Sequence, residues 1–142
     1  LVGLAGEYGI KRGVVSSTVT KIAGINNLRH MARAWAFIEY TLAAFTHTTS
    51  IPKTHYYVEK EHASIDEGMD EGPGGGVKHV AEQIRELGAE HCIISTDFGV
   101  YTLPEPVEGL REFIACLLDL GISSEDIGRL VKENPEKLLG LF

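Results

Sequence analysis

A short segment with residue types suited to catalysis, Ser95-Thr96-Asp97-Phe98-Gly99, directly follows the apolar run Cys92–Ile94. A short apolar run bounded by turn residues is typical of a strand that is buried on both faces of a parallel sheet. Ligands gather at the carboxyl ends of such strands, so we expect Asp97 to face a binding site. A carboxylate there can bind a divalent metal or accept a proton from a metal-bound water. A structural role, in which Asp97 opens a turn or caps the next segment, stays open.

Three histidines, His47, His55 and His62, share the polar stretch 46–76 with several carboxylates. Imidazole and carboxylate groups together could hold zinc or another divalent ion. No pair has a spacing that would fix two ligands on one element, so a solvated acidic loop is the competing interpretation. His47 is the strongest candidate because it follows directly after an expected strand. The sequence thus offers Asp97 as catalytic residue and Asp97 with His47 as metal ligands.

Composition limits the class of protein. The chain has 142 residues, 44% apolar and 23% charged, which fits one globular domain over 1–142 and excludes wholesale disorder or a coiled coil. A net charge of −7 argues against a nucleic-acid partner.

The longest apolar run, 34–45, is too short for a membrane span and is interrupted by Glu39. With no signal-peptide pattern and only two cysteines, we expect a cytoplasmic protein that acts on a small molecule. Because the chain begins with Leu1, it is expected to be a piece of something longer.

The second half of the chain shows clear helical periodicity on both sides of the expected strand. Apolar residues at helical spacing predict helices over 77–87 and 107–120, each followed by a glycine, Gly88 or Gly121. Ser123 predicts the start of another helix, and Asn134-Pro135 is expected to stop it and to begin a last helical turn, with Asn134 as the N-cap.

The first half predicts alternating strands and helices. A helix tail over Leu1–Tyr8, a strand over Ile10–Ser17, a helix over Leu28–Ala34 capped by Asn26 or Asn27, and a strand over Phe37–Phe45 are expected. Together with the strand Cys92–Asp97 these make a strand–helix–strand–helix–strand order, which predicts an α/β fold with parallel strands. The stretch 46–76 is far longer than a normal strand-to-helix loop and is interpreted as a loop insertion, a functional lid or a mobile segment.

The last third of the chain resembles a known family. The resemblance is carried by the strand that ends in Asp97, by Pro104-Glu105-Pro106-Val107-Glu108-Gly109-Leu110, and by Asn134-Pro135-Glu136-Lys137-Leu138-Leu139-Gly140-Leu141. These segments are similar to the C-terminus of amidohydrolase-superfamily proteins, and most similar to a poorly characterised amidohydrolase-related branch. The strand at Phe37–Thr41 also resembles the preceding barrel strand of that branch.

The resemblance implies a (β/α)8 TIM barrel with a divalent metal at the carboxyl ends of the strands, and zinc is the expected metal. A whole barrel takes about 250 residues, so this chain corresponds to strands six to eight, at Ile10–Ser17, Phe37–Phe45 and Cys92–Asp97. Of the family's ligands only Asp97 carries over, as metal ligand and as the base that activates water. Ser16 and its neighbours stand where relatives tend to carry a histidine.

Three hypotheses follow. The first is the C-terminal segment of a metal-dependent hydrolase that cleaves a C–N or ester bond of a small molecule and is inactive as this chain alone. The second is a non-catalytic structural or interaction module that keeps the scaffold and has lost metal ligands. The third is a separate metal site built from His47, His55, His62 and Asp97. In the first two, unpaired strand edges are expected to favour self-association.

Overall fold

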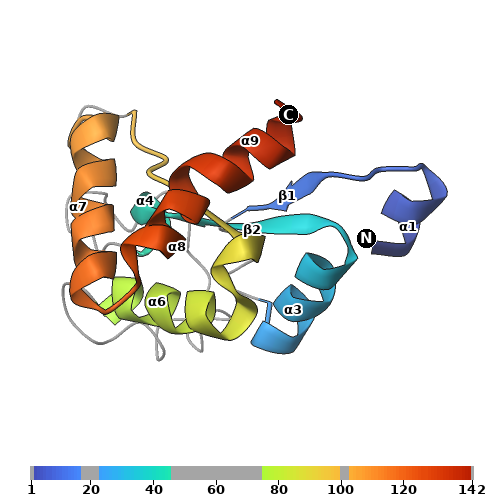
Figure 1. The fold of residues 1–142 in the computed structure, drawn as a ribbon, viewed down its shortest axis with the longest axis horizontal. Coiled ribbons are helices and arrows are strands. Elements are labelled where there is room, and N and C mark those ends of the chain that lie inside the picture. Colours follow the sequence, from blue (N-terminus) through green and yellow to red (C-terminus); the bar gives the residue numbers. More distant parts are fainter. Residues whose placement is uncertain (1, 17–22, 46–74, 100–102, 142) are drawn as a thin grey trace, which may run out of the picture.

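The computed structural model describes residues 2–16, 23–45, 75–99 and 103–141 (Figure 1). Their helices and strands are, in chain order, α1 (Val2–Glu7), β1 (Gly13–Val15), α3 (Ile25–Ala34), β2 (Ala36–Thr41), α4 (Leu42–Phe45), α6 (Gly75–Leu87), η2 (Ala89–His91), β3 (Cys92–Ser95), α7 (Pro106–Asp119), α8 (Ser124–Gly128), η3 (Arg129–Glu133) and α9 (Asn134–Leu139). The protein is therefore a mixed α/β structure, as the sequence predicts.

The strands form one parallel sheet in the order β1-β2-β3, so each strand lies beside the next strand in the sequence. In the register of the sheet, Val15 pairs with Ile38 and Ile38 pairs with Cys92. The predicted alternation of strand and helix is confirmed for these three strands. Their carboxyl ends lie at the same edge, because parallel strands all run in one direction.

One face of the sheet carries the main core. Because side chains alternate across a strand, Ile38 and Tyr40 of β2 share a face with Cys92 and Ile94 of β3. These residues form one buried cluster with the apolar sides of α3 and α6. Figure 1 shows α3 and α6 side by side on the same side of the strands. The helices that follow β1 and precede β3 thus cover the same face.

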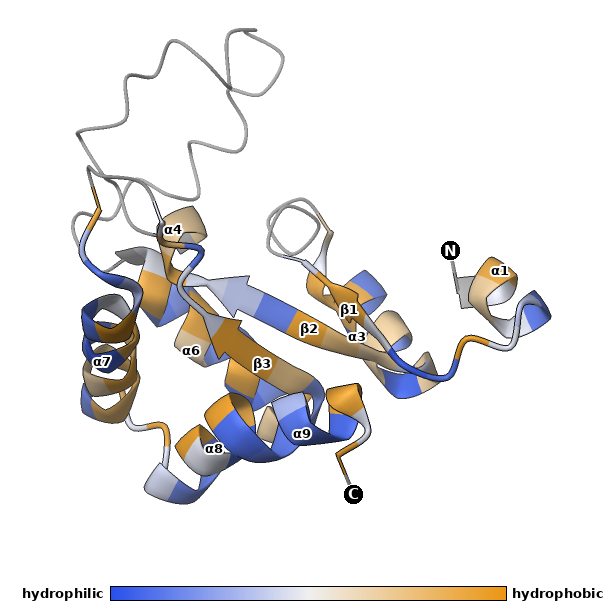
Figure 2. Cartoon of the chain, turned by 90° about the horizontal axis from the view of Figure 1, so that it is seen from above, coloured by the Kyte–Doolittle hydropathy of each residue, from blue (hydrophilic) through white to orange (hydrophobic). Residues whose placement is uncertain are grey.

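The opposite face of the sheet is covered only in part by the described residues. Figure 2 views the strands from this side, with α3 and α6 behind them and α8 and α9 running alongside β3. This open face carries Val14, Phe37, Glu39, Ile93 and Ser95. Val14 is 41% exposed, whereas Ile93 is 7% exposed, so the face is covered unevenly.

The helix boundaries follow from local sequence. Gly88 and Gly121, which the sequence places after α6 and α7, both have positive φ angles (92° and 83°), as helix-terminating glycines do. The Ser123 hydroxyl accepts a hydrogen bond from the backbone N–H of Asp126, which confirms Ser123 as the cap of α8. None of the described helices is long and apolar enough to cross a membrane.

The three strands are shorter than the sequence predicts. Pairing with β2 covers only Gly13–Val15, so Ile10 lies outside β1 and is half exposed, and Ser17 lies outside the described residues. β2 ends at Thr41, and the predicted strand residues that follow form the short helix α4 instead. An apolar run does not distinguish a buried strand from a buried helical turn, which explains this error.

Two predicted caps are wrong. The helix α3 begins at Ile25 with Gly24 as its N-cap, one turn before the expected start, so neither Asn26 nor Asn27 is the cap. Asn134 does not cap a separate turn either, because its φ and ψ angles (−70° and −43°) are helical. The chain passes from α8 to α9 through the wide π-helical turn η3, in which the N–H of Asn134 donates to the carbonyl of Arg129. Asn134 is instead fully buried against β3.

Candidate site at the carboxyl ends of the strands

Asp97 lies two residues beyond the end of β3, at the edge where the sequence predicts a site, and its side chain is exposed. Its φ angle is 55°, a left-handed conformation that Asp adopts more readily than most other non-glycine residues. Within the described residues the carboxylate makes no hydrogen bond or ion pair. The predicted strand Cys92–Asp97 is therefore two residues too long, and Thr96 separates Asp97 from the end of β3.

The residues on either side of Asp97 are anchored. Thr96 is buried, and its hydroxyl accepts a hydrogen bond from the backbone N–H of Phe98 at 3.3 Å. The ring of Phe98 packs on Gly109 of α7 so closely that a Cβ at Gly109 would overlap it. Because both neighbours are held in this way, the backbone presents the Asp97 carboxylate to solvent at a fixed place.

Hydroxyl side chains stand at the ends of the other two strands. Thr41, the last residue of β2, is buried, and its Oγ1 has no hydrogen-bond partner in the described part of the chain. Ser16 follows β1 and is exposed. The N–H of Ala43 donates to the carbonyl of Thr96 at 3.0 Å, which ties the start of α4 to the end of β3.

A second carboxylate lies on the open face of the sheet. The Ser95 hydroxyl donates a hydrogen bond to Oε1 of Glu39 at 3.0 Å, and both side chains are half-buried. The sequence analysis did not select Glu39 as a site residue, although a charged residue within an otherwise apolar run is a detectable signal. Glu39 gives the open face a negative charge on the middle strand.

Of the predicted metal ligands, the structure describes only Asp97. His47, His55 and His62 lie outside the described residues, so pairing of His47 with Asp97 stays a prediction. Across the described ranges, no group of three His, Cys, Asp or Glu side chains could hold a metal ion.

The structure describes three further histidines. His30 and His79 are exposed on α3 and α6. His91 precedes β3, at the opposite end of the strand from Asp97.

A feature that the sequence analysis missed is a basic pocket at the amino ends of the strands. It gathers Lys11, Arg12, Arg33, His91 and Lys137, together with Glu90. These residues come from separate parts of the sequence, and only the adjacent pair Lys11-Arg12 forms a local basic signal. Their convergence depends on the fold and is not visible in any single segment.

The chain matches no protein-family model, no curated protein and no solved structure. The geometry described above is therefore the basis for any statement about what the protein does.

Proposed function

We propose that this chain is the C-terminal segment of a metal-dependent, amidohydrolase-type hydrolase acting on a C–N or ester bond of a small molecule. In this proposal the whole fold is a cytoplasmic (β/α)8 barrel, and β1, β2 and β3 are its strands six to eight. The order of the strands supports it, because consecutive parallel strands add at one edge and the helices α3 and α6 cover one face.

The observation that carries the proposed chemistry is the position of Asp97. It lies two residues beyond the last strand, at the carboxyl edge where barrel enzymes place catalytic groups, and its carboxylate is exposed and unpaired among the described residues. The proposed role of Asp97 is that of a metal ligand and of a base toward a hydrolytic water.

The described residues do not form a metal site by themselves. Asp97 is one candidate ligand, and a catalytic zinc takes about three protein ligands. What Asp97 contributes within the described structure is therefore limited to a fixed, solvent-facing carboxylate. The proposal requires the other ligands to come from residues outside the described ranges.

The second candidate function is a non-catalytic structural or interaction module on the same scaffold. It is favoured by Ser16, which directly follows β1 at the carboxyl edge. The family resemblance leads us to expect a histidine near this position. A serine hydroxyl is a much poorer zinc ligand than imidazole, so a scaffold with Ser16 at this place has lost one ligand.

Metal content and turnover test the hydrolase proposal. We expect the chain alone to retain no stoichiometric zinc and to cleave no model ester. We expect a longer protein that contains the proposed upstream strands to bind zinc and to cleave the ester. There, Asp97→Asn is expected to abolish turnover, whereas the matched control Asp119→Asn, at an exposed site on α7, is expected to leave it unchanged.

Two results would contradict this proposal. Stoichiometric zinc and turnover in the isolated chain would show that it is not a segment of a larger site. The family resemblance implies a His-x-His pair of metal ligands at the end of the first barrel strand. An upstream sequence without this pair would contradict the hydrolase proposal and favour the non-catalytic module.

A further inference from the structure

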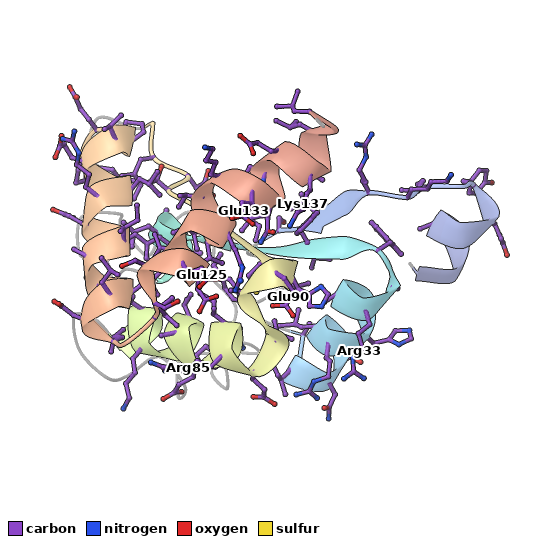
Figure 3. The ribbon with its side chains drawn as sticks, viewed as in Figure 1. Arg33, Arg85, Glu90, Glu125, Glu133 and Lys137 are labelled. Carbon is purple, nitrogen blue, oxygen red and sulfur yellow. The ribbon has the colours of Figure 1, made fainter. Side chains whose placement is uncertain are left out.

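A cavity of about 360 Å³ lies at the amino edge of the sheet, opposite the edge that carries Asp97. Its walls come from the residues that lead into each strand: Lys11 and Arg12 before β1, Arg33 and Trp35 before β2, and Glu90 before β3. Lys137 of α9 completes it. Figure 3 shows Arg33, Glu90 and Lys137 extending from α3, η2 and α9. Cavities of about 300–1,000 Å³ are the usual size for small-molecule sites.

The charge of this cavity is opposite to that of the whole chain. Four of the chain's 13 lysines and arginines line it, and Glu90 is the one acidic residue among its walls, whereas the net charge of the chain is −7. A concave basic site on an acidic protein raises the local concentration of small anions.

Two of the four cations have no partner within the described part of the chain. The guanidinium of Arg12 donates to the carbonyl of Lys137 at 3.5 Å, and the ammonium of Lys137 lies 3.9 Å from Glu133. Lys11 and Arg33 make no hydrogen bond or ion pair with any described residue. Both side chains are exposed, so a small anion in solution can reach them.

An aromatic wall stands beside the cations. The indole ring of Trp35 packs closely on Gly13 of β1, which fixes its position, and Phe37 lines the same cavity. Indole rings favour contact with other planar rings, and guanidinium groups favour phosphate oxygens.

We propose that this cavity binds a small phosphate-bearing molecule with a planar ring, of the nucleoside monophosphate type. The ring contacts Trp35, and Lys11 and Arg33 contact the phosphate. The inference does not depend on the proposed hydrolase function, because it concerns the opposite edge of the sheet and residues that the hydrolase proposal does not use.

A structural role is the competing explanation for these cations. α3 ends at Ala34 and α9 ends at Leu139, and cations near helix C-termini stabilise the unpaired carbonyl groups. Such a role changes the melting temperature when a cation is removed, but it gives no binding of an anion.

Trp35 is the only tryptophan in the chain, so its fluorescence reports on this cavity alone. We expect titration with adenosine 5′-monophosphate to change the Trp35 emission in a saturable way and to raise the melting temperature. Inorganic phosphate is expected to compete, adenosine is expected to bind more weakly, and added salt is expected to weaken binding.

Arg33→Gln and Lys11→Gln are each expected to weaken binding about tenfold, the loss expected for one charge-assisted contact. Both side chains are exposed and unpaired among the described residues, so the variants should fold. The matched control is Arg111→Gln, on α7, which should bind like the unchanged protein. Absence of a saturable signal, equal binding of adenosine, or identical titrations of Arg33→Gln and Arg111→Gln would each overturn the proposal.

Discussion

The side-chain Nδ2 of Asn134 lies 2.7 Å from the carbonyl oxygen of Cys92, so a residue of the last helix holds the first residue of β3. The same nitrogen donates to the carbonyl of Ala89, also at 2.7 Å. Asn134 is fully buried. Its side chain thus has a structural role, which is to satisfy two buried carbonyl groups at the start of the strand that leads to Asp97.

Asn134→Ala is expected to lower the free energy of unfolding by about 2–4 kcal/mol, because two buried carbonyl groups lose their donor. Urea denaturation measures the change. Asn27→Ala, at an exposed position of α3 that caps nothing, is expected to stay within about 0.5 kcal/mol of the unchanged protein. Equal midpoints for the two variants would contradict the role of Asn134.

Ser95→Ala is expected to cost about 1 kcal/mol, since it removes the hydroxyl that donates to Glu39 on the open face. Glu39→Gln should cost less, because the amide oxygen of Gln can still accept from the Ser95 hydroxyl. The comparison is made by urea denaturation at neutral pH. If the glutamine variant were the less stable of the two, the hydrogen bond would not be what places Glu39.

Gly109→Ala tests the packing that fixes the segment after β3. The added methyl group would overlap the ring of Phe98, so we expect a loss of about 1–3 kcal/mol, although alanine favours helix. Gly128→Ala is the matched control, because its Cβ meets nothing within 4 Å and its backbone is helical. A gain of up to about 1 kcal/mol is expected there. A gain at both sites would show that Phe98 does not lie on α7.

The stability of the protein is expected to fall in alkaline solution. Burial, and to a smaller extent the charge of Glu90, raise the pKa of the Cys92 thiol from its ordinary value of 9.0 to about 12. Above pH 9 the unfolded chain loses this proton while the folded chain keeps it, so the free energy of unfolding decreases between pH 9 and 12. Burial raises the pKa of Tyr40 as well, which acts in the same direction.

Cys92→Ala is expected to be less stable than the unchanged protein at neutral pH but to show a shallower decline, by about 1.4 kcal/mol per pH unit, between pH 9 and 12. Denaturant melts at several pH values measure the slope. Cys116→Ala, which removes an exposed thiol from α7, should keep the full decline. Parallel slopes for the unchanged protein and Cys92→Ala would disprove the assignment to Cys92.

Self-association is expected at raised protein concentration. Among the described strands β1 and β3 each have one neighbour, and Val14 on the open face of β1 is 41% exposed. Val14→Lys should reduce association in sedimentation experiments, whereas Val107→Lys, at a 61% exposed position on α7, should not. Equal association of the two variants would place the contact elsewhere.

The sequence predicts best those elements whose signals are local. The apolar stripes of α6 and α7, with Gly88 and Gly121 after them, and the cap at Ser123 require only neighbouring residues, and the structure confirms them. The predicted end of β2 is wrong because an apolar segment such as Leu42–Phe45 fits a buried strand and a buried helical turn equally well.

The parts that the sequence does not predict depend on long-range packing. Asn134 reads as a helix cap because it precedes a proline, and only the position of β3 shows why it is buried. For the same reason the sequence does not predict the basic cavity, because Lys11 and Lys137 are far apart in the sequence and line the same cavity only in the folded chain.

The π-helical turn Arg129–Glu133 has a consequence for how the length of this region can vary. A π turn holds an extra residue compared with a regular α-helical turn. Deleting one residue there would convert the π turn into a regular α-helical turn and leave the directions of the helix on either side nearly unchanged. Homologous chains should therefore tolerate the loss of one residue between Ile127 and Asn134, provided that the fully buried Leu130 and Asn134 are kept.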